Sequence, residues 1–160
     1  MPIAKEVMVE NVKTFHPQDK VSKVAKTFAE YGISGAPVVD DENKVVGVIT
    51  EHDLIRLGEE HPKLLTPIES HLPLSLGLSI KDHDPEKMAE ALSDIKEKKV
   101  EEAMTENVRT LPPDAGLGKI ARVMKKREIN RVPIVDEDNK LLGLVARADV
   151  VKGFWEKEEE

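Results

Sequence analysis

The sequence predicts an α/β (α+β) fold in which one β-α-β-β-α unit is used twice. Residues 7–54 align with residues 103–150 at a constant offset of 96 positions, without a gap and with 16 identities in 48 positions. Each copy shows the same succession of a helical apolar stripe and two short β-branched runs. A repeat of this length indicates duplicated half-domains rather than a solenoid of short units.

Each copy opens with a short extended segment that ends at Pro17 or Pro113. Apolar residues then recur at i, i+3, i+4 and i+7, which is typical of a helix that faces a core. Gly32 follows the first of these helices, where a left-handed backbone is needed, and Glu128 has the matching place in the second copy. The stripes are Val21, Val24, Ala25 and Phe28 in the first copy and Leu117, Ile120, Ala121 and Met124 in the second.

A hairpin and a second helix complete each copy. The stretches "APVVDDENKVVGVI" and "VPIVDEDNKLLGLV" each place two β-branched runs around a polar turn, which predicts two strands joined by that turn. The second helix is expected from about Glu51 in the first copy and from about Arg147 in the second. The order of elements is therefore the same in both copies.

Each hairpin also contains one glycine, Gly47 or Gly143. A glycine inside a strand marks a bulge or a close approach of another backbone. We therefore interpret both glycines as structural residues rather than as ligand contacts.

The repeat boundaries divide the chain into four parts. They are the first repeat at 1–58, an insert at 59–99, the second repeat at 100–153 and an acidic tail at 154–160. In the insert, apolar residues alternate with others over residues 72–80, which predicts an extended strip, and Asp84 with Pro85 predicts the start of a helix that ends near Lys99. The insert either packs across the two repeats or forms a dimer contact, and the sequence favours neither.

Composition excludes several classes of protein. The chain is 39% hydrophobic, which suffices for a packed core, and it has no apolar run long enough to cross a membrane and no signal peptide. We therefore expect a cytoplasmic protein. The absence of cysteine excludes disulfides and sulfur-ligated metals, and a net charge of -7 argues against general nucleic-acid binding.

The sequence contains none of the common short motifs of catalytic or metal-binding sites. The sequence has no G-x-S-x-G, no H-E-x-x-H and no P-loop, so we expect no enzyme and no required cofactor. The five histidines show no short metal-ligand spacing, so we expect no metal site. His16 and His52 lie at motif positions of the first repeat, where either could touch a ligand.

Three motifs recur in order in both copies. They are "TFHPQDKV" and "TLPPDAGL", then "ISGAPVVD" and "INRVPIVD", and last "GVITEHD" and "GLVARAD". This pattern resembles the CBS domain, whose tandem pairs are called Bateman modules. The resemblance implies two repeats related by a pseudo-two-fold axis with their sheets packed together. It also implies two clefts that in many members bind adenosine-containing ligands.

The resemblance also implies which residues line the clefts. The aspartate of the last motif would hold the ribose hydroxyls, and the residues of the other repeat would surround the base and phosphate. The first cleft would then combine Thr50, Asp53, Thr110, Asn130, Arg131 and Val132. The second cleft would combine Asp149, Thr14, His16, Ser34, Gly35 and Ala36.

The chemistry of these residue types supports the same hypothesis independently. One ionised carboxylate accepts both donors of a vicinal diol, and a helix N-terminus is a ready site for phosphate. Arg131 offers a planar fork for phosphate. Only the first cleft has both the hydroxyl of Thr50 and this arginine, because Ala146 and Gly35 have the matching places, so we expect the tighter phosphorylated ligand there.

A structural alternative exists for the same residues. Thr50 with Asp53 three positions later is close to a capping box, in which both side chains only bind the amides of their own helix. Ala146 has no hydroxyl, yet Asp149 is retained, so we argue that capping alone does not explain Asp149.

Two functions therefore stand beside each other. The first is a regulatory module that senses AMP, ADP, ATP or S-adenosylmethionine and acts on an effector protein. The second is a structural module that dimerises or docks a partner while its clefts stay empty. We expect a homodimer in either case, because the strip 72–80 is more apolar than a small domain needs to expose.

Overall fold

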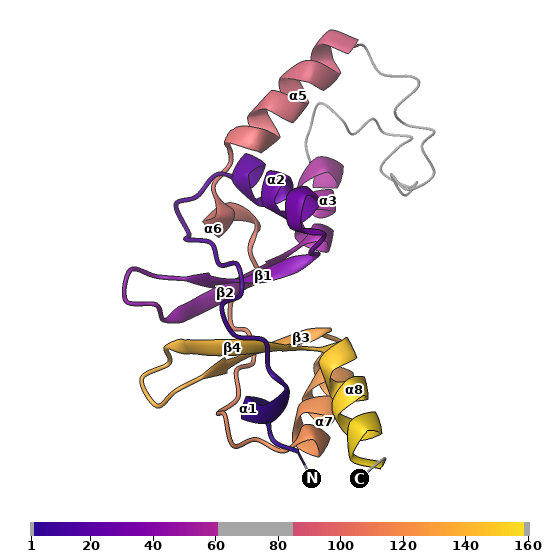
Figure 1. The fold of residues 1–160 in the computed structure, drawn as a ribbon. Helices are drawn as coiled ribbons and strands as arrows, with labels where there is room; N and C mark the ends of the chain where they lie inside the picture. The colour runs from indigo at the N-terminus through magenta and orange to yellow at the C-terminus, as the bar shows by residue number, and fades with distance from the viewer. Residues whose placement is uncertain (1, 61–84, 159–160) are drawn as a thin grey trace. The chain divides into compact units, whose positions relative to one another are not determined.

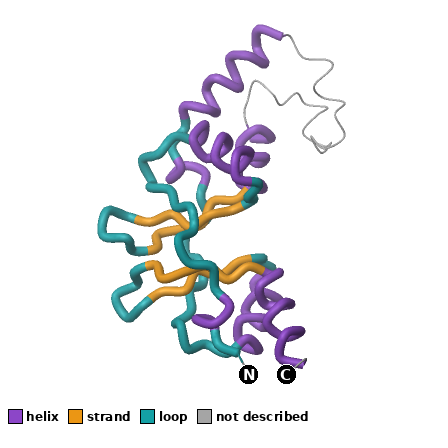
Figure 2. Tube along the Cα trace, in the orientation of Figure 1, coloured by secondary structure: helices purple, strands orange, loops and turns teal. Residues whose placement is uncertain are grey.

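The structure is a computed structural model that describes residues 2–60 and 85–158. The strip expected at 72–80 lies outside the described residues. Two antiparallel hairpins and their helices make up the fold, and Figures 1 and 2 show the two strands of each hairpin joined by a turn. The described residues form two compact units, one within Met1–His16, Ala36–Val48 and Thr105–Glu160 and the other within Pro17–Gly35 and Ile49–Met104.

The first unit contains the whole second hairpin and its two helices. Strands β3 (Arg131–Val135) and β4 (Leu141–Ala146) pair antiparallel, and Val132 lies opposite Val145. Helices α7 (Leu117–Arg127) and α8 (Arg147–Glu158) lie together on one face of this hairpin (Figure 1). The predicted order of helix, hairpin and helix is confirmed here. The leading extended segment of this copy forms only isolated bridges, such as that of Leu111 with Ile134.

The core of the first unit follows the predicted stripe. Leu117, Ile120 and Met124 of α7 are buried against the inner faces of β3 and β4. The short helix α1 (Ala4–Val7) adds Ala4, which is completely buried in the same cluster. The stripe is buried because its 3.6-residue period keeps these side chains on one side of the helix.

Gly143 lies where the sequence predicted a close strand approach. The register of β3 and β4 shifts between Ile134 and Val135, which is a β-bulge, and Gly143 pairs with Ile134 beside it. A Cβ atom on Gly143 would lie 2.7 Å from the Sδ of Met8 and 3.0 Å from the carbonyl oxygen of Val9. Gly143 is therefore required because the segment with Met8 and Val9 passes too close to β4 to leave room for a Cβ atom.

The first unit also contains the turn of the first hairpin, which connects β1 (Gly35–Val39) to β2 (Val45–Thr50). Asn43 and Asn139, one in each turn, have positive φ values of 64° and 65°. The Asn43 side chain donates to the Leu141 carbonyl at 3.3 Å, and the Asn139 side chain donates to the Val45 carbonyl at 3.0 Å. The backbone amides of Leu141 and Val45 return hydrogen bonds to the two asparagine carbonyls. We call this reciprocal set of bonds the asparagine clasp.

Among the described residues, the second unit consists mainly of helices, two from the first repeat and two from the segment between the hairpins. It contains α2 (Val21–Tyr31), α3 (Glu51–Glu60), α5 (Pro85–Glu97) and α6 (Val100–Ala103). Helix α5 belongs to the insert and contacts both α2 and α3. The described part of the insert therefore packs on the helices of the first repeat. The two roles that the sequence left open, packing across both repeats and a dimer contact, stay predictions.

The apolar stripe of α2 is buried only in part. Val21, Val24 and Phe28 are buried as predicted, but Ala25 is exposed, so its inclusion in the core stripe was wrong. The i+4 position of this helix lies at the edge of the stripe, and a small alanine tolerates either environment. Gly32 ends α2 with φ 63°, which confirms the left-handed backbone expected there. Glu128 ends α7 with φ 56°, so the second copy keeps this conformation without a glycine.

The leading segment of each copy pairs outside its own copy. In the first unit Val9 exchanges hydrogen bonds with Leu144 at 2.9 and 3.0 Å, and Ile3 forms a bridge with Gly116. In the second unit Lys99 forms the equivalent bridge with Lys20. This exchange explains why the compact units do not coincide with the sequence repeats.

Candidate functional site

The first candidate site lies where β2 ends and α3 begins. Thr50 is the residue before the helix, and its hydroxyl accepts the Asp53 amide at 3.3 Å. In return Asp53 Oδ2 accepts the backbone amide of Thr50 at 2.9 Å and its hydroxyl at 3.1 Å. These reciprocal bonds make a capping box, so the structural alternative for these two residues is realised in this arrangement.

The second oxygen of Asp53 is engaged by Arg56. Arg56 Nη2 lies 3.1 Å from Asp53 Oδ1 and also donates to the carbonyl of Ala103 at 3.0 Å. The Asp53 side chain is 3% exposed and that of Arg56 is 41% exposed. Both oxygens of this carboxylate therefore have partners within the second unit.

The second copy has the same helix start with fewer bonds. Asp149 Oδ2 accepts the backbone amide of Ala146 at 2.7 Å, which is half of a capping box. Asp149 is therefore a capping residue even without a hydroxyl at Ala146, and the argument that its retention speaks against capping was wrong. Its carboxylate needs only the backbone amide of the residue three positions earlier, which any amino acid except proline provides.

Asp149 differs from Asp53 in its remaining oxygen. Lys152 has the position that Arg56 has in the first copy, but its ammonium lies 3.6 Å from Glu156. Across the described ranges, the structure gives Asp149 Oδ1 no hydrogen-bond partner, and the residue is half-buried. This oxygen is an available acceptor at a helix start.

The helix starts are also tied to the middle motif of their own copy. The carbonyl of Ser34 accepts the Glu51 amide at 2.9 Å, and the carbonyl of Asn130 accepts the Arg147 amide at 2.9 Å. The structure thus brings the middle and last motifs of each copy together. The sequence did not predict these contacts.

The other residues expected in the first cleft lie around β3 in the first unit. Val132 is completely buried in the core of that unit, so its side chain is not a ligand contact in this arrangement. Arg131 and Thr110 are half-buried, and Asn130 is exposed. Thr50 and Asp53 belong to the second unit, so the combination of all six residues in one cleft stays a prediction.

The second cleft is divided in the same way. Thr14 is half-buried and His16 exposed, on either side of Phe15, whose amide donates to the Pro37 carbonyl at 3.1 Å. Ala36 is buried in β1. Ser34 and Gly35 belong to the second unit, and Thr14, His16, Ala36 and Asp149 belong to the first.

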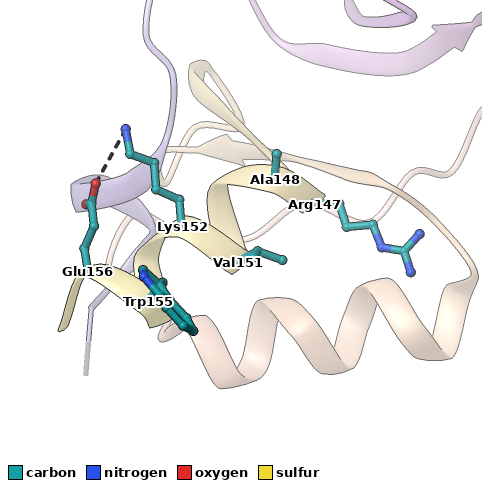
Figure 3. A pocket seen from close by; sticks show the side chains of 6 residues that line it. All are labelled: Arg147, Ala148, Val151, Lys152, Trp155 and Glu156. Carbon is teal, nitrogen blue, oxygen red and sulfur yellow. Dashed lines mark ion pairs between the residues drawn. The ribbon is translucent and has the colours of Figure 1, made fainter. Parts of the chain in front are cut away.

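The exposed side of α8 carries features that sequence analysis did not identify. An open hollow of ≈ 840 Å³ is lined by Arg147, Ala148, Val151, Lys152, Trp155 and Glu156, and Figure 3 shows the Lys152 ammonium turned toward Glu156. Val151 is 64% exposed and Trp155 is 67% exposed. Helix α8 continues through Glu158, so it includes the first residues of the segment expected as a tail, and the apolar pair Phe154 and Trp155 was the available signal.

A groove of ≈ 710 Å³ lies between α7 and α8 in the same unit. Its apolar lining includes Met124, Ile129 and Phe154, and its polar lining includes Asn130 and Arg147. Within residues 2–60 and 85–158, no group of three or more acidic or histidine side chains is placed to hold a metal ion. None of the helices described is both long and apolar enough to cross a bilayer.

The fold and the two helix starts define a tandem repeat module, and comparison with known proteins identifies its family. The CBS domain family matches residues 4–60 and again residues 100–156. Since these matches cover more than half of the chain, the protein belongs to the CBS domain family and carries a tandem pair of these domains.

Similar proteins include a sequence relative and two solved structures with bound ligands. An uncharacterized protein of Methanocaldococcus jannaschii, MJ1426, is 31% identical over 158 residues, which are 95% of this chain and 90% of that protein. The CBS domain pair of protein MJ0100, solved with 5′-methylthioadenosine and S-adenosyl-L-methionine, is 26% identical with a TM-score of 0.67, and the alignment covers 98% of both chains. CBSX2 solved in complex with AMP has a TM-score of 0.71 at 22% identity and 98% coverage of both chains, which is a likeness of fold.

Proposed function

We propose that this protein is a regulatory module that binds an adenosine-containing ligand in clefts between its two CBS repeats. The observation that carries the proposal is the aspartate at the start of the second helix in both copies, with Asp149 Oδ1 available as an acceptor. A carboxylate in this place accepts a ribose diol, and the helix N-terminus beside it favours phosphate. The bound 5′-methylthioadenosine and S-adenosyl-L-methionine of MJ0100, a protein of the same fold and 26% identity, support this ligand class.

The two clefts are proposed to be unequal. The first combines Thr50 and Asp53 with Thr110, Asn130, Arg131 and the backbone at Val132, and it contains the arginine that suits a phosphate. The second combines Asp149 with Thr14, His16, Ser34, Gly35 and Ala36. We therefore expect AMP, ADP or ATP to prefer the first cleft. The second cleft is expected to accept a ligand without phosphate groups.

A thermal-shift panel tests the ligand class. A ligand that binds only the folded state at 100 times its Kd stabilises the protein by about 2.7 kcal/mol, which is a shift of several degrees. The panel contains AMP, ADP, ATP and S-adenosylmethionine at matched ionic strength. Its control is 2′-deoxy-AMP, which keeps the base and the phosphate but lacks the diol.

The panel also separates the two functions. Stabilisation by AMP or S-adenosylmethionine that is much weaker with the deoxy analogue supports the diol-binding aspartates. Equal stabilisation by AMP and 2′-deoxy-AMP contradicts their role. No stabilisation by any ligand favours the structural assembly module, and Thr50 and Asp53 are then only a helix cap.

A homodimer is part of the same proposal. In the first unit the exposed apolar side chains of α8, Val151 and Trp155, lie beside the groove between α7 and α8. In the second unit α5 contacts the corresponding helices α2 and α3. The α7–α8 face is thus the better surface for a second copy of the chain, since an exposed apolar face is most stable against a matching one.

Light scattering tests the dimer. We expect Val151→Glu to shift the mass toward the monomer at low protein concentration. Ile55→Glu is the matched control, because Ile55 has the same place in the first copy and is 54% exposed. A concentration-independent monomer mass for the unmodified protein contradicts the proposal of a homodimer.

The proposed function also includes a cytoplasmic location and an effector protein that receives the signal. It includes no catalytic activity and no required cofactor.

A further inference from the structure

Arg56 contacts the candidate ligand residue Asp53 but lies outside the three sequence motifs, the last of which ends at Asp53. It is on α3, three residues after Asp53, so its side chain is on the same face of the helix as that carboxylate. One nitrogen, Nη2, serves two acceptors: Asp53 Oδ1 at 3.1 Å and the carbonyl of Ala103 at 3.0 Å. Arg56 therefore connects the candidate ligand residue to the last residue of α6.

The bond from Arg56 competes with a ribose diol for the same carboxylate. Asp53 Oδ2 already accepts two hydrogen bonds from Thr50, and Oδ1 accepts the one from Arg56. A diol brings two donors that need acceptor positions on these oxygens. Since Asp53 is 2% exposed, a ligand cannot approach Oδ1 without a change in its neighbours.

Arg56 is the neighbour that can move at the lowest cost. Its side chain is 41% exposed, so water can solvate the guanidinium once it leaves the carboxylate. Glu60 Oε1 lies 3.9 Å from Arg56 Nε on the solvent side of the same helix and offers an alternative partner. Thr50, in contrast, is fixed by the backbone at the end of β2.

We propose that Arg56 is a displaceable latch that closes Asp53 until a diol ligand takes its place. The inference rests on the proposed function, because it names how access to that site is controlled. Displacement of Arg56 also removes its hydrogen bond to the Ala103 carbonyl, so α6 loses an anchor when the ligand binds. The ligand then has different affinities for the latched and open states, which is the requirement for a regulatory change.

The second copy provides an internal comparison for this latch. Lys152 has the equivalent position but lies 3.6 Å from Glu156, and Asp149 Oδ1 has no partner across the described ranges. The second site is therefore open without displacement of a side chain. The latch makes the two sites differ in their response even where they bind the same ligand.

Calorimetry with AMP and with S-adenosylmethionine tests the proposal on the full chain. The variants are Arg56→Met, which keeps the apolar stem and removes the donor, and Lys152→Met as the matched control. We expect Arg56→Met to tighten binding at the site that Asp53→Asn weakens, by about three- to tenfold, because one partly exposed charged hydrogen bond no longer competes. Lys152→Met is expected to leave both sites unchanged.

Hydrogen exchange at the Met104 amide gives a second measurement. This amide donates to the Val100 carbonyl at 2.8 Å and so reports on α6. In the unmodified protein the ligand is expected to accelerate this exchange, whereas in Arg56→Met the exchange is already fast and does not respond to ligand. Circular dichroism at the same temperature verifies that both variants are folded.

Each outcome decides between the hypotheses. Binding that Arg56→Met weakens or leaves unchanged overturns the latch but not the proposed function, and a weakened site indicates that Arg56 contacts the ligand itself. Binding that appears only in Arg56→Met supports the latch. Failure of AMP and S-adenosylmethionine to bind any variant overturns the proposed function and, with it, the latch as a gate.

Discussion

The starts of α3 and α8 are the same element in two copies, and they use their aspartate differently. At α3 the carboxylate of Asp53 has partners on both oxygens, and the residue is buried. At α8 the carboxylate of Asp149 binds one backbone amide through Oδ2. The first copy has both the threonine hydroxyl and the aspartate expected to bind a ligand, yet the carboxylate of Asp53 already accepts more hydrogen bonds than that of Asp149. A matching residue type establishes the chemistry of a site, whereas its neighbours decide whether that chemistry is accessible.

The largest expected effect separates the structural roles of the two aspartates. Asp53→Ala removes three hydrogen bonds to a buried carboxylate and leaves the Thr50 amide without its partner. We expect it to lower the free energy of unfolding by about 2–3 kcal/mol. Asp149→Ala removes one bond at a helix start and is expected to lower it by about 1 kcal/mol. Urea denaturation without ligand measures both.

Asp53→Asn is the control for this pair of variants. It keeps the shape and one oxygen acceptor, so it removes the charge opposite Arg56 and replaces one acceptor by an amide donor without opening a cavity. Equal losses of stability for Asp53→Ala and Asp149→Ala would mean that Arg56 and the Thr50 hydroxyl contribute nothing to the cap. The difference between the two copies would then be one of geometry without energetic consequence.

A smaller effect is expected at the asparagine clasp, where the two copies are nearly equal. Asn43→Gly and Asn139→Gly keep the positive φ but remove the amide that donates to the other turn. We expect each to lower the free energy of unfolding by about 0.5–1.5 kcal/mol. The bond from Asn139 is 3.0 Å and that from Asn43 is 3.3 Å, so the loss should be larger for Asn139→Gly.

The double variant shows whether the clasp acts as one structure. If the two bonds support each other, the losses of Asn43→Gly and Asn139→Gly are not additive, and the coupling energy is about 0.5 kcal/mol or more. Additive losses would show two independent turn contacts. Thermal denaturation followed by circular dichroism is sufficient for this comparison.

The order of elements could be predicted from the sequence because it depends on local periodicity. The stripe of α7, the left-handed Gly32 after α2 and the close approach at Gly143 all follow from the side-chain pattern near each position. The left-handed Glu128 after α7 does not, because a residue with a Cβ atom gives no signal for this conformation. Ala25 was assigned wrongly because a small side chain at the edge of a stripe carries little burial preference.

The contacts that distinguish the two sites could not be predicted in the same way. The spacing of Asp53 and Arg56 is visible in the sequence, but the second acceptor of Arg56, Ala103, is 47 positions away. The exchange of leading segments, such as Val9 with Leu144, is also long-range and leaves no periodic signal. Such contacts depend on how complete elements pack, so local pattern alone does not contain them.

The smallest expected effect concerns the residues that end α2 and α7. Gly32 and Glu128 have the same left-handed backbone, with φ values of 63° and 56°, and the amide of each donates to the last turn of its helix, at Phe28 and Met124. A residue with a Cβ atom is strained in this conformation, whereas glycine is not. Glu128→Gly is therefore expected to raise the free energy of unfolding by about 0.5–1 kcal/mol.

Gly32→Ala is the matched reverse change. A Cβ atom on Gly32 would meet no other atom within 4 Å, so the variant reports on the backbone alone. We expect it to lower the free energy of unfolding by about 1 kcal/mol. Urea denaturation of both variants with an unchanged slope would confirm opposite signs at equivalent positions. If Glu128→Gly instead destabilises the protein, the glutamate side chain makes a stabilising contribution at the end of α7 that exceeds the backbone strain.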